Sequence, residues 1–398
     1  SLGGQPATVD FDYRGPAYNS DPSAATLTST EDVIRGVFAW FEANGGTGRP
    51  IRGTPSIPGI NPNIDGTLVS PSTDEFAFGL VKRLGTKGSL RGDVVHRKSN
   101  DFYATRVDMG TGTVSGSLAG VTRTFDKQII VNTGEERREY WGFTLSASYR
   151  FFQGLQLQGN WTWARLRGTF DGENAASGSL RSVAPFYSEY RAAEWSRPVG
   201  DLGADQRHKV RLWAIYDLPF DVSWFKSSVS ILQQYDTGTP YGAVGNIDSR
   251  PYVNAATNSA YLNEPSTVVY YFTARDAYRT DDISRTDLSL NLSFRPAGSL
   301  EIFIEPQVLN VFNQQNVVTP ATTIQTQNNT GNQPGITPPV PSFAAFNPFT
   351  EQPKQGPRAT GGATPTYNWN YASTFGTPSA ATSYQLARTF RVSVGLRF

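Results

Sequence analysis

Segments in which apolar and polar residues strictly alternate are the feature that most limits how this chain can fold. In the last ten residues, Phe, Val and Leu occupy the even positions, whereas Arg391, Arg397, Ser and Gly occupy odd positions. A strand with this pattern has one apolar face and one charged face. Two arginines on one face would be costly in the core of a water-soluble sheet. The pattern therefore favours a sheet whose apolar face lies outside and whose polar face lies inside.

The same alternation recurs along most of the chain and predicts about ten strands. Nine of them are predicted at residues 75–84, 88–98, 139–151, 154–166, 206–218, 223–237, 284–295, 299–312 and 387–398. A weaker segment near 124–133 is either the tenth strand or part of a loop. Strands of about ten residues with this period are long enough to cross a bilayer when they are tilted.

Short and long connections alternate between the predicted strands. The short turns fall at residues 85–88, 152–154, 219–222 and 296–299, and the long loops at about 99–138, 167–205, 238–283 and 313–386. If the last strand ends in the periplasm, every short turn lies on that side. This arrangement is typical of transmembrane antiparallel β-barrels with long extracellular loops. Loops of this length are uncommon in a compact water-soluble domain.

Composition supports the same class of protein. Aromatic residues make up 13% of the chain, and Trp141, Trp161 and Phe398 lie at ends of predicted strands, as expected for the aromatic girdles of a barrel. Aromatic residues in the core of a water-soluble sandwich are the alternative, but they would leave the charged opposite faces unexplained. The net charge of +1 gives no bulk attraction for nucleic acid, and the absence of cysteine excludes disulfides and thiolate metal sites.

The N-terminal part follows a different pattern. Residues 1–74 are predicted to be an extracellular loop region with one short helix at about 30–44, whereas residues 75–398 form the barrel strands and their loops. A signal like a capping box, formed either by Ser29 with Asp32 or by Thr28 with Glu31, begins the helix, and two glycines follow its end. The sequence starts with Ser rather than Met, so we expect either a processed start or a part of a longer chain.

Several longer motifs resemble a known family. They are PSTDEFAFGLVKRLG at 71–85, EYWGFTLSASYRFFQGLQLQGNWTWAR at 139–165, DQRHKVRLWAIYDLP at 205–219, YDTGTPY at 235–241, IFIEPQVLNVFNQQN at 302–316, and the terminal Phe398. In this order they resemble the TonB-dependent outer-membrane receptors, most closely the Oar-like subgroup.

The resemblance implies a function and a set of partners. Such receptors have about 22 strands around a plug, so this chain would be their C-terminal barrel portion. The plug and the remaining strands would come from the same precursor or from another chain. The expected role is energised uptake of a large or scarce ligand across a Gram-negative outer membrane. The expected partners are outer-membrane lipid, the barrel-assembly machinery and, indirectly, the TonB system, with no nucleic acid.

Two other functions are compatible with a barrel. One is a surface barrel with an adhesive, structural or export role and no energised transport. The other is a protease at the rim of a small barrel, because Asp205 precedes His208 by three residues. With only two histidines and no nucleophile motif, the sequence predicts no enzyme, metal site or cofactor.

Three groups of residues are candidates for functional roles. The assembly signal would be Phe398, Leu396 and Val394, because a C-terminal aromatic residue after alternating apolar positions resembles the signal read during barrel assembly. The candidates for the lumen face are Arg91, Asp93, Arg150, Arg211, Asp287, Arg295, Glu301, Glu305, Arg391 and Arg397. The candidates for recognition in the loops are Phe346, Phe349, Tyr367, Trp369 and Tyr371. These loop aromatics would either bind a ligand or pack the loops together.

Overall fold

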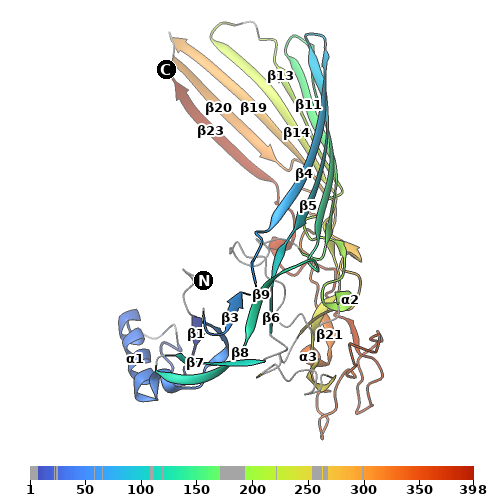
Figure 1. Ribbon diagram of the computed structural model, residues 1–398. Helices are drawn as coiled ribbons and strands as arrows, with labels where there is room; N and C mark the ends of the chain where they lie inside the picture. The colour runs from blue at the N-terminus through green and yellow to red at the C-terminus, as the bar shows by residue number, and fades with distance from the viewer. Residues whose placement is uncertain are drawn as a thin grey trace.

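A computed structural model shows a curved antiparallel sheet joined to a layer of loops (Figure 1). It describes residues 8–398 except 22, 24–25, 58, 65, 108–111, 119, 171–192, 221, 253–261, 263–267 and 298–299. Parts of the predicted loops 99–138, 167–205 and 238–283 and of two predicted turns therefore lie outside the described residues.

Nine long strands form the main sheet. They are β4 (Ser72–Leu84), β5 (Gly88–Asn100), β10 (Arg138–Phe152), β11 (Leu155–Gly168), β13 (His208–Asp217), β14 (Phe225–Asp236), β19 (Ile283–Ala297), β20 (Leu300–Leu309) and β23 (Thr389–Arg397). Each pairs antiparallel with its neighbours in chain order, and the two-residue strand β12 (Gly200–Asp201) adds to β11. The sheet is open, with β4 and β23 as its two edges.

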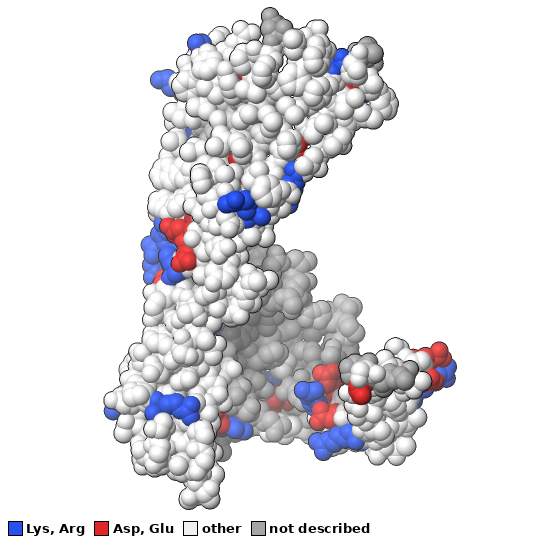
Figure 2. Space-filling view, turned by 180° about the vertical axis from the view of Figure 1, so that it is seen from behind, with Lys and Arg blue, Asp and Glu red and all other residues white. Residues whose placement is uncertain are grey.

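The register gives the sheet two distinct faces. Leu145 of β10 lies opposite Trp161 of β11, which lies opposite Val210 of β13. Farther along the sheet, Ile304 lies opposite Val394. We call this side the apolar face and the opposite side the polar face. Figure 2 shows a broad area with few charged residues over the end of the molecule that the strands form.

Glycines allow two of the tight turns at one end of the sheet. Gly85 follows β4 with a φ of 61°, and Gly154 precedes β11 with a φ of 96°. Side chains with a Cβ rarely adopt these angles. The chain can therefore reverse within three residues, and the C-terminus lies at the same end of the sheet (Figure 1).

The segment predicted as a possible tenth strand lies outside the main sheet. Residues 124–133 are divided between β8 (Val121–Asp126) and β9 (Gln128–Thr133). β8 pairs with β7 (Thr113–Leu118), whereas β9 lies between β3 (Pro62–Ile64) and β6 (Phe102–Val107). The chain changes partner at Lys127, whose backbone N–H donates to Gly112 O at 2.9 Å.

The N-terminal residues form an arm beside the loop layer. α1 (Thr30–Ala43) lies where the sequence predicts a helix, and the Ser29 side chain accepts from Asp32 N at its start. No residue of α1 is buried, and its aromatic rings contact the preceding segment. β1 (Thr8–Asp10), β2 (Arg52–Ser56) and the 3-10 turn η1 (Gly46–Gly48) complete the arm. Among the described helices, none is long and apolar enough to span a bilayer.

Short elements and a buried aromatic core organise the rest of the loop layer. The elements are α2 (Ala193–Ser196), β15 (Pro240–Tyr241), β16 (Val244–Ile247), η4 (Arg250–Tyr252), β17 (Val268–Tyr271), β18 (Tyr278–Arg279), β21 (Ile324–Thr326), α3 (Gln327–Thr330), β22 (Trp369–Tyr371) and η5 (Ala381–Ser383). Two groups of buried side chains hold them together, one around Trp195 and Tyr270 and the other around Ile324 and Trp369. The loops are thus packed against one another around a core of their own.

Candidate functional site

Charged side chains on the polar face form local ion pairs and hydrogen bonds. Glu301 is the clearest case, because Arg295 Nη2 donates to it at 3.0 Å and Arg397 Nη1 lies at 3.6 Å. Ser293 Oγ also donates to Glu301, at 2.7 Å. One carboxylate therefore links the last three strands of the sheet.

Most of the other predicted lumen residues also have partners. Asp93 pairs with Arg91 at 2.7 Å, Asp287 with Arg285 at 2.9 Å, Arg211 with Asp236 at 2.8 Å, and Glu305 accepts from Ser289 Oγ at 2.9 Å. Arg150 and Arg391 differ, since no described residue forms an ion pair with either of them, and both are exposed. Two cations on the polar face are thus available to a group outside the described residues.

The predicted assembly signal lies on an edge strand. Val394 and Leu396 of β23 pair with Ile304 and Ile302 of β20 on the apolar face. Leu396 is 61% exposed and the terminal Phe398 is 98% exposed. The other edge of β23 has no partner within the described chain.

Both histidines lie on the apolar face, near the loop layer, and each contacts a tryptophan. His208 Nδ1 accepts from Trp161 Nε1 at 3.2 Å, whereas Asp205 accepts from Leu166 N and Arg279. His96 stacks on Trp141 with 4.1 Å between ring centroids and bonds to Glu139 at 2.9 Å. His208 and Asp205 therefore do not form a catalytic pair in this structure. The sequence predicts that Trp141 and Trp161 lie on the apolar face. It does not predict that each of them contacts a histidine from another strand.

Asp205 belongs instead to a buried ionic cluster, which we call the aspartate clamp (Asp201, Asp205, Arg165, Arg207 and Arg279). The Asp205 carboxylate is fully buried and accepts from Leu166 N and from Arg279 Nη2, both at 2.7 Å. Asp201 accepts from Arg207 at 2.6 Å, from Arg279 at 2.9 Å and from Arg165 at 3.1 Å. Since these residues come from three segments, the clamp fixes the loops to the ends of β11 and β13.

The electrostatics of the clamp favour charged carboxylates. Burial alone would raise the pKa of Asp201, but the hydrogen bond from Arg165 and the charges of Arg207, Arg165 and Arg279 outweigh it. The pKa of Asp201 is therefore below its ordinary value.

The five aromatic residues predicted for recognition occupy different environments in the loop layer. Trp369 and Phe346 are buried within the two aromatic groups. Tyr371 is hydrogen-bonded to Tyr278 at 2.5 Å, and burial, followed by that bond, raises its pKa to about 12. Phe349 and Tyr367 are partly exposed at 39% and 38%. Phe349 nevertheless lies edge-to-face with the buried Trp195 at 5.9 Å. Four of the five therefore pack the layer together, and of the five only Phe346 lines the cavity described next.

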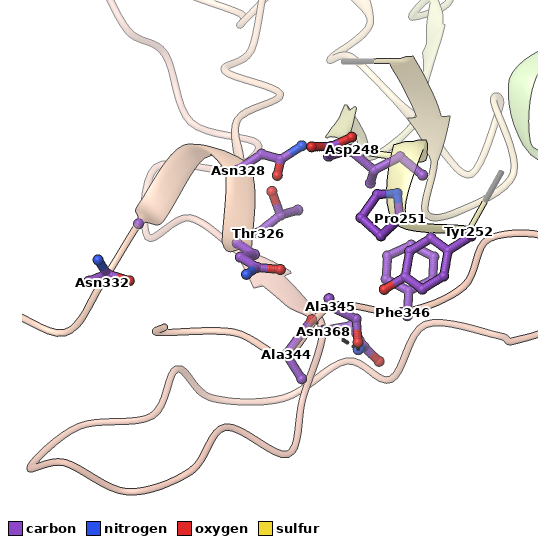
Figure 3. A pocket seen from close by; sticks show the side chains of 13 residues that line it. Asp248, Pro251, Tyr252, Thr326, Asn328, Asn332, Ala344, Ala345, Phe346 and Asn368 are labelled. Atoms are coloured by element: carbon purple, nitrogen blue, oxygen red, sulfur yellow. Dashed lines mark hydrogen bonds between the residues drawn. The ribbon is translucent and has the colours of Figure 1, made fainter. Parts of the chain in front are cut away.

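A cavity of about 410 Å³ lies in the loop layer (Figure 3). Figure 3 shows Pro251, Tyr252 and Phe346 on one side and Thr326 and Asn328 on the other. The lining residues come from four places in the chain: residues 247–252, 326–332, 344–346 and Asn368. Its volume falls within the range of small-molecule binding sites.

Sequence reasoning missed most of the residues that line this cavity. Tyr252 lies in the predicted loop 238–283, where no sequence feature indicates a binding site. Asn328 lies in the amide-rich run QTQNNTGNQ at 325–333. That run is the one sequence feature that could have indicated a binding site here, because its amides provide many hydrogen-bonding groups. The pairing of β21 with β22 brings it to the aromatic residues.

A comparison with known protein families agrees with this architecture. Residues 17–340 match the family described as outer membrane beta barrel domain. A search of curated proteins finds no match. Among solved structures, the FrpB iron transporter of Neisseria meningitidis is similar at 13% identity and a TM-score of 0.35, covering 64% of this chain and 29% of FrpB. The outer membrane transporter YddB of Escherichia coli is similar at 14% identity and a TM-score of 0.37, covering 64% of this chain and 30% of YddB. The part of this chain that aligns thus spans less than a third of the length of each of these two transporters.

Proposed function

Since the chain belongs to the outer membrane beta barrel domain family, we propose that it supplies part of the wall and the outer loops of a TonB-dependent receptor. The protein is located in the outer membrane of a Gram-negative cell, where the apolar face of its sheet contacts lipid. The receptor would take up a large or scarce ligand by energised transport. The motifs around residues 205–241 and 302–316 are the basis for assigning it to the Oar-like subgroup.

The direction of the edge strands is the observation that carries this proposal. Nine strands in antiparallel succession leave the first and the last, β4 and β23, running in the same direction. Direct closure of β4 on β23 would require a parallel pair, whereas outer-membrane barrels are antiparallel. Antiparallel closure needs an odd number of additional strands. A receptor barrel of about 22 strands meets this parity, because it adds 13 strands to these nine, and it is wide enough to hold a plug.

The polar face is consistent with a plug inside such a barrel. Arg150 and Arg391 have no ion-pair partner in the described chain, and exposed guanidinium groups bind carboxylates well. We expect acidic residues of the plug to contact them. Catalysis is not part of the proposal, because His208 contacts Trp161 and Asp205 is engaged by arginines.

The composition of the native complex tests this function. Outer membranes are extracted with detergent, the complex that contains this chain is captured on the isolated periplasmic domain of TonB, and its polypeptides are sequenced and weighed intact. We expect capture together with a plug and further strands, either in a longer precursor or in a second chain. A barrel that runs alone at about 43.5 kDa and does not bind TonB contradicts the proposal. That result leaves an adhesive, structural or export barrel as the explanation.

A further inference from the structure

One wall of the loop-layer cavity is aromatic and firmly held. Phe346 is only 8% exposed, and its ring lies edge-to-face with Tyr270 at 5.2 Å and with Phe272 at 6.0 Å. Pro251 and Tyr252 complete this wall, and the 3-10 turn η4 fixes their backbone. The wall therefore offers a flat, preformed apolar surface to a ligand.

The opposite wall carries hydrogen-bonding groups that the protein does not use. Gln327, Asn328 and Asn332 line the cavity, and their side-chain amides make no hydrogen bond to any described residue. Each amide provides two donors and one acceptor oxygen. By contrast, Asn368 on the floor of the cavity is engaged, since it donates to Ala344 O and accepts from Lys354 N. The three unused amides are free to bind a ligand that has both donors and acceptors.

The lining is close to electrically neutral. Among the described residues, Asp248 is the one charged residue of the lining, and none of the others is a lysine or an arginine. Arg250 neutralises Asp248 with bonds of 2.6 and 2.9 Å to its two carboxylate oxygens. An anionic ligand would find no cation to pair with among the described lining residues, and a cationic ligand would compete with Arg250 for the Asp248 carboxylate.

The phenol of Tyr252 adds a donor beside the aromatic wall. Burial raises the pKa of Tyr252, and the charges of Glu351 and Asp248 raise it further. The hydroxyl is therefore protonated at neutral pH, and it has no hydrogen-bond partner among the described residues. It is available to donate to an oxygen of the ligand.

From these features we propose that the cavity binds a neutral saccharide segment, with one sugar face against Tyr252 and hydroxyl groups bonded to Asn328 and Gln327. A sugar ring has an apolar C–H face and a rim of hydroxyls that both donate and accept, and it carries no charge. An apolar surface opposite free amides is complementary to that chemistry. The inference rests on the proposed function, in which the loop layer faces the external medium and captures the ligand.

A glycan array tests the assignment with the full protein, purified in detergent with its native partners. The array includes neutral oligosaccharides built from the common hexoses, deoxyhexoses and N-acetylhexosamines, together with acidic glycans, and a ferric catecholate complex is titrated in parallel. We expect a neutral glycan to bind, and Tyr252→Ala and Asn328→Ala each to weaken its binding about tenfold. Tyr252→Phe keeps the ring and should lower the affinity for the glycan only a few-fold. Tyr384→Ala removes a ring that is 38% exposed and does not line the cavity, and it should leave the affinity unchanged.

The possible outcomes separate this inference from the proposed transport. Failure of every neutral glycan to bind overturns it, as does binding that is the same in the wild type, Tyr252→Ala and Asn328→Ala. Binding of only acidic glycans or the ferric complex also overturns it. Saccharide binding at this cavity without TonB-dependent uptake contradicts the transport function and leaves the cavity assignment intact. TonB-dependent uptake of a ligand that is insensitive to both variants supports transport and overturns the assignment.

Discussion

Asp205 shows how much the role of one residue depends on contacts far away in the sequence. Its spacing from His208 suggests a catalytic pair, but its carboxylate is saturated by Leu166 N and by two arginines. Arg279 comes from a segment more than 70 residues later, so no local pattern predicts the contact. The buried carboxylate is stable there because each of its oxygens accepts a hydrogen bond.

At the residue scale, we expect the aspartate clamp to make the stability of the loop layer depend on pH. The pKa of Asp201 is lower in the folded layer than its ordinary value of 3.8. Its stabilisation is therefore complete above that value and is lost as the pH falls through the lower, folded pKa. Asp201→Asn should cost about 1–3 kcal/mol at neutral pH, less than the loss of an isolated buried pair because Asp205 still binds Arg207 and Arg279.

Thermal unfolding of the loop layer, followed by the fluorescence of the buried Trp195 and Trp369, measures this effect between pH 7 and pH 2. The unfolding temperature of the wild type should fall at the acid end of this range. That of Asp201→Asn should be lower at pH 7 and should fall less. Asp217→Asn, at the opposite end of β13, serves as the control and should behave as the wild type. Equal acid sensitivity in the wild type and Asp201→Asn would show that Asp201 is not the titrating group.

At the element scale, strands were predictable and loop structure was not. The alternating segment at 139–151 corresponds to β10 (Arg138–Phe152), because a period of two fixes both the strand and its faces. The strand predicted at 299–312 ends earlier, at Leu309, where Asn310 adopts a φ of 53° and its side chain binds Gln314 O and Leu386 O. The cavity was not predictable either, since the four parts of the chain that line it meet through long-range pairing such as that of β21 with β22.

The two faces of β10 should respond differently to the same substitution. Leu145 points from the apolar face into lipid, near the middle of the strand, so Leu145→Arg should destabilise the folded barrel by about 2–4 kcal/mol. Ser148→Arg places the same charge on the polar face of the same strand and should cost less than about 1 kcal/mol. Urea unfolding of the refolded barrel in detergent or lipid gives both free energies. Similar losses for the two variants would contradict the assignment of the faces.

At the scale of the whole molecule, the parity of the strands decides how the wall closes. β4 and β23 run in the same direction, and each has one edge without a partner in the described chain. Unpaired backbone groups cannot face the hydrocarbon core of a membrane. The edges must therefore be covered, and antiparallel strands running opposite to β4 and β23 are the complement that fits both.

Engineered cysteines can report whether the two edges meet. The chain contains no cysteine, so any disulfide within it must join the two engineered residues. Each test pair combines Phe78→Cys or Leu80→Cys on β4 with Val392→Cys or Val394→Cys on β23. We expect no disulfide from any of these pairs after oxidation in intact outer membranes. Ile304→Cys with Val394→Cys is the positive control, because these residues lie opposite each other on β20 and β23. A disulfide between β4 and β23 would mean that the edges close directly.

The length of β10 determines how far the loop layer lies from the middle of the bilayer. Its 15 residues span about 50 Å at 3.3 Å per residue, whereas a strand tilted by about 40° needs only about 33 Å to cross a 25 Å apolar belt. Roughly a third of the strand therefore extends beyond the apolar belt into the head-group regions. The loop layer that continues from β10 therefore lies outside the apolar belt, so a bulky solute can reach the layer from the medium without entering the hydrocarbon core.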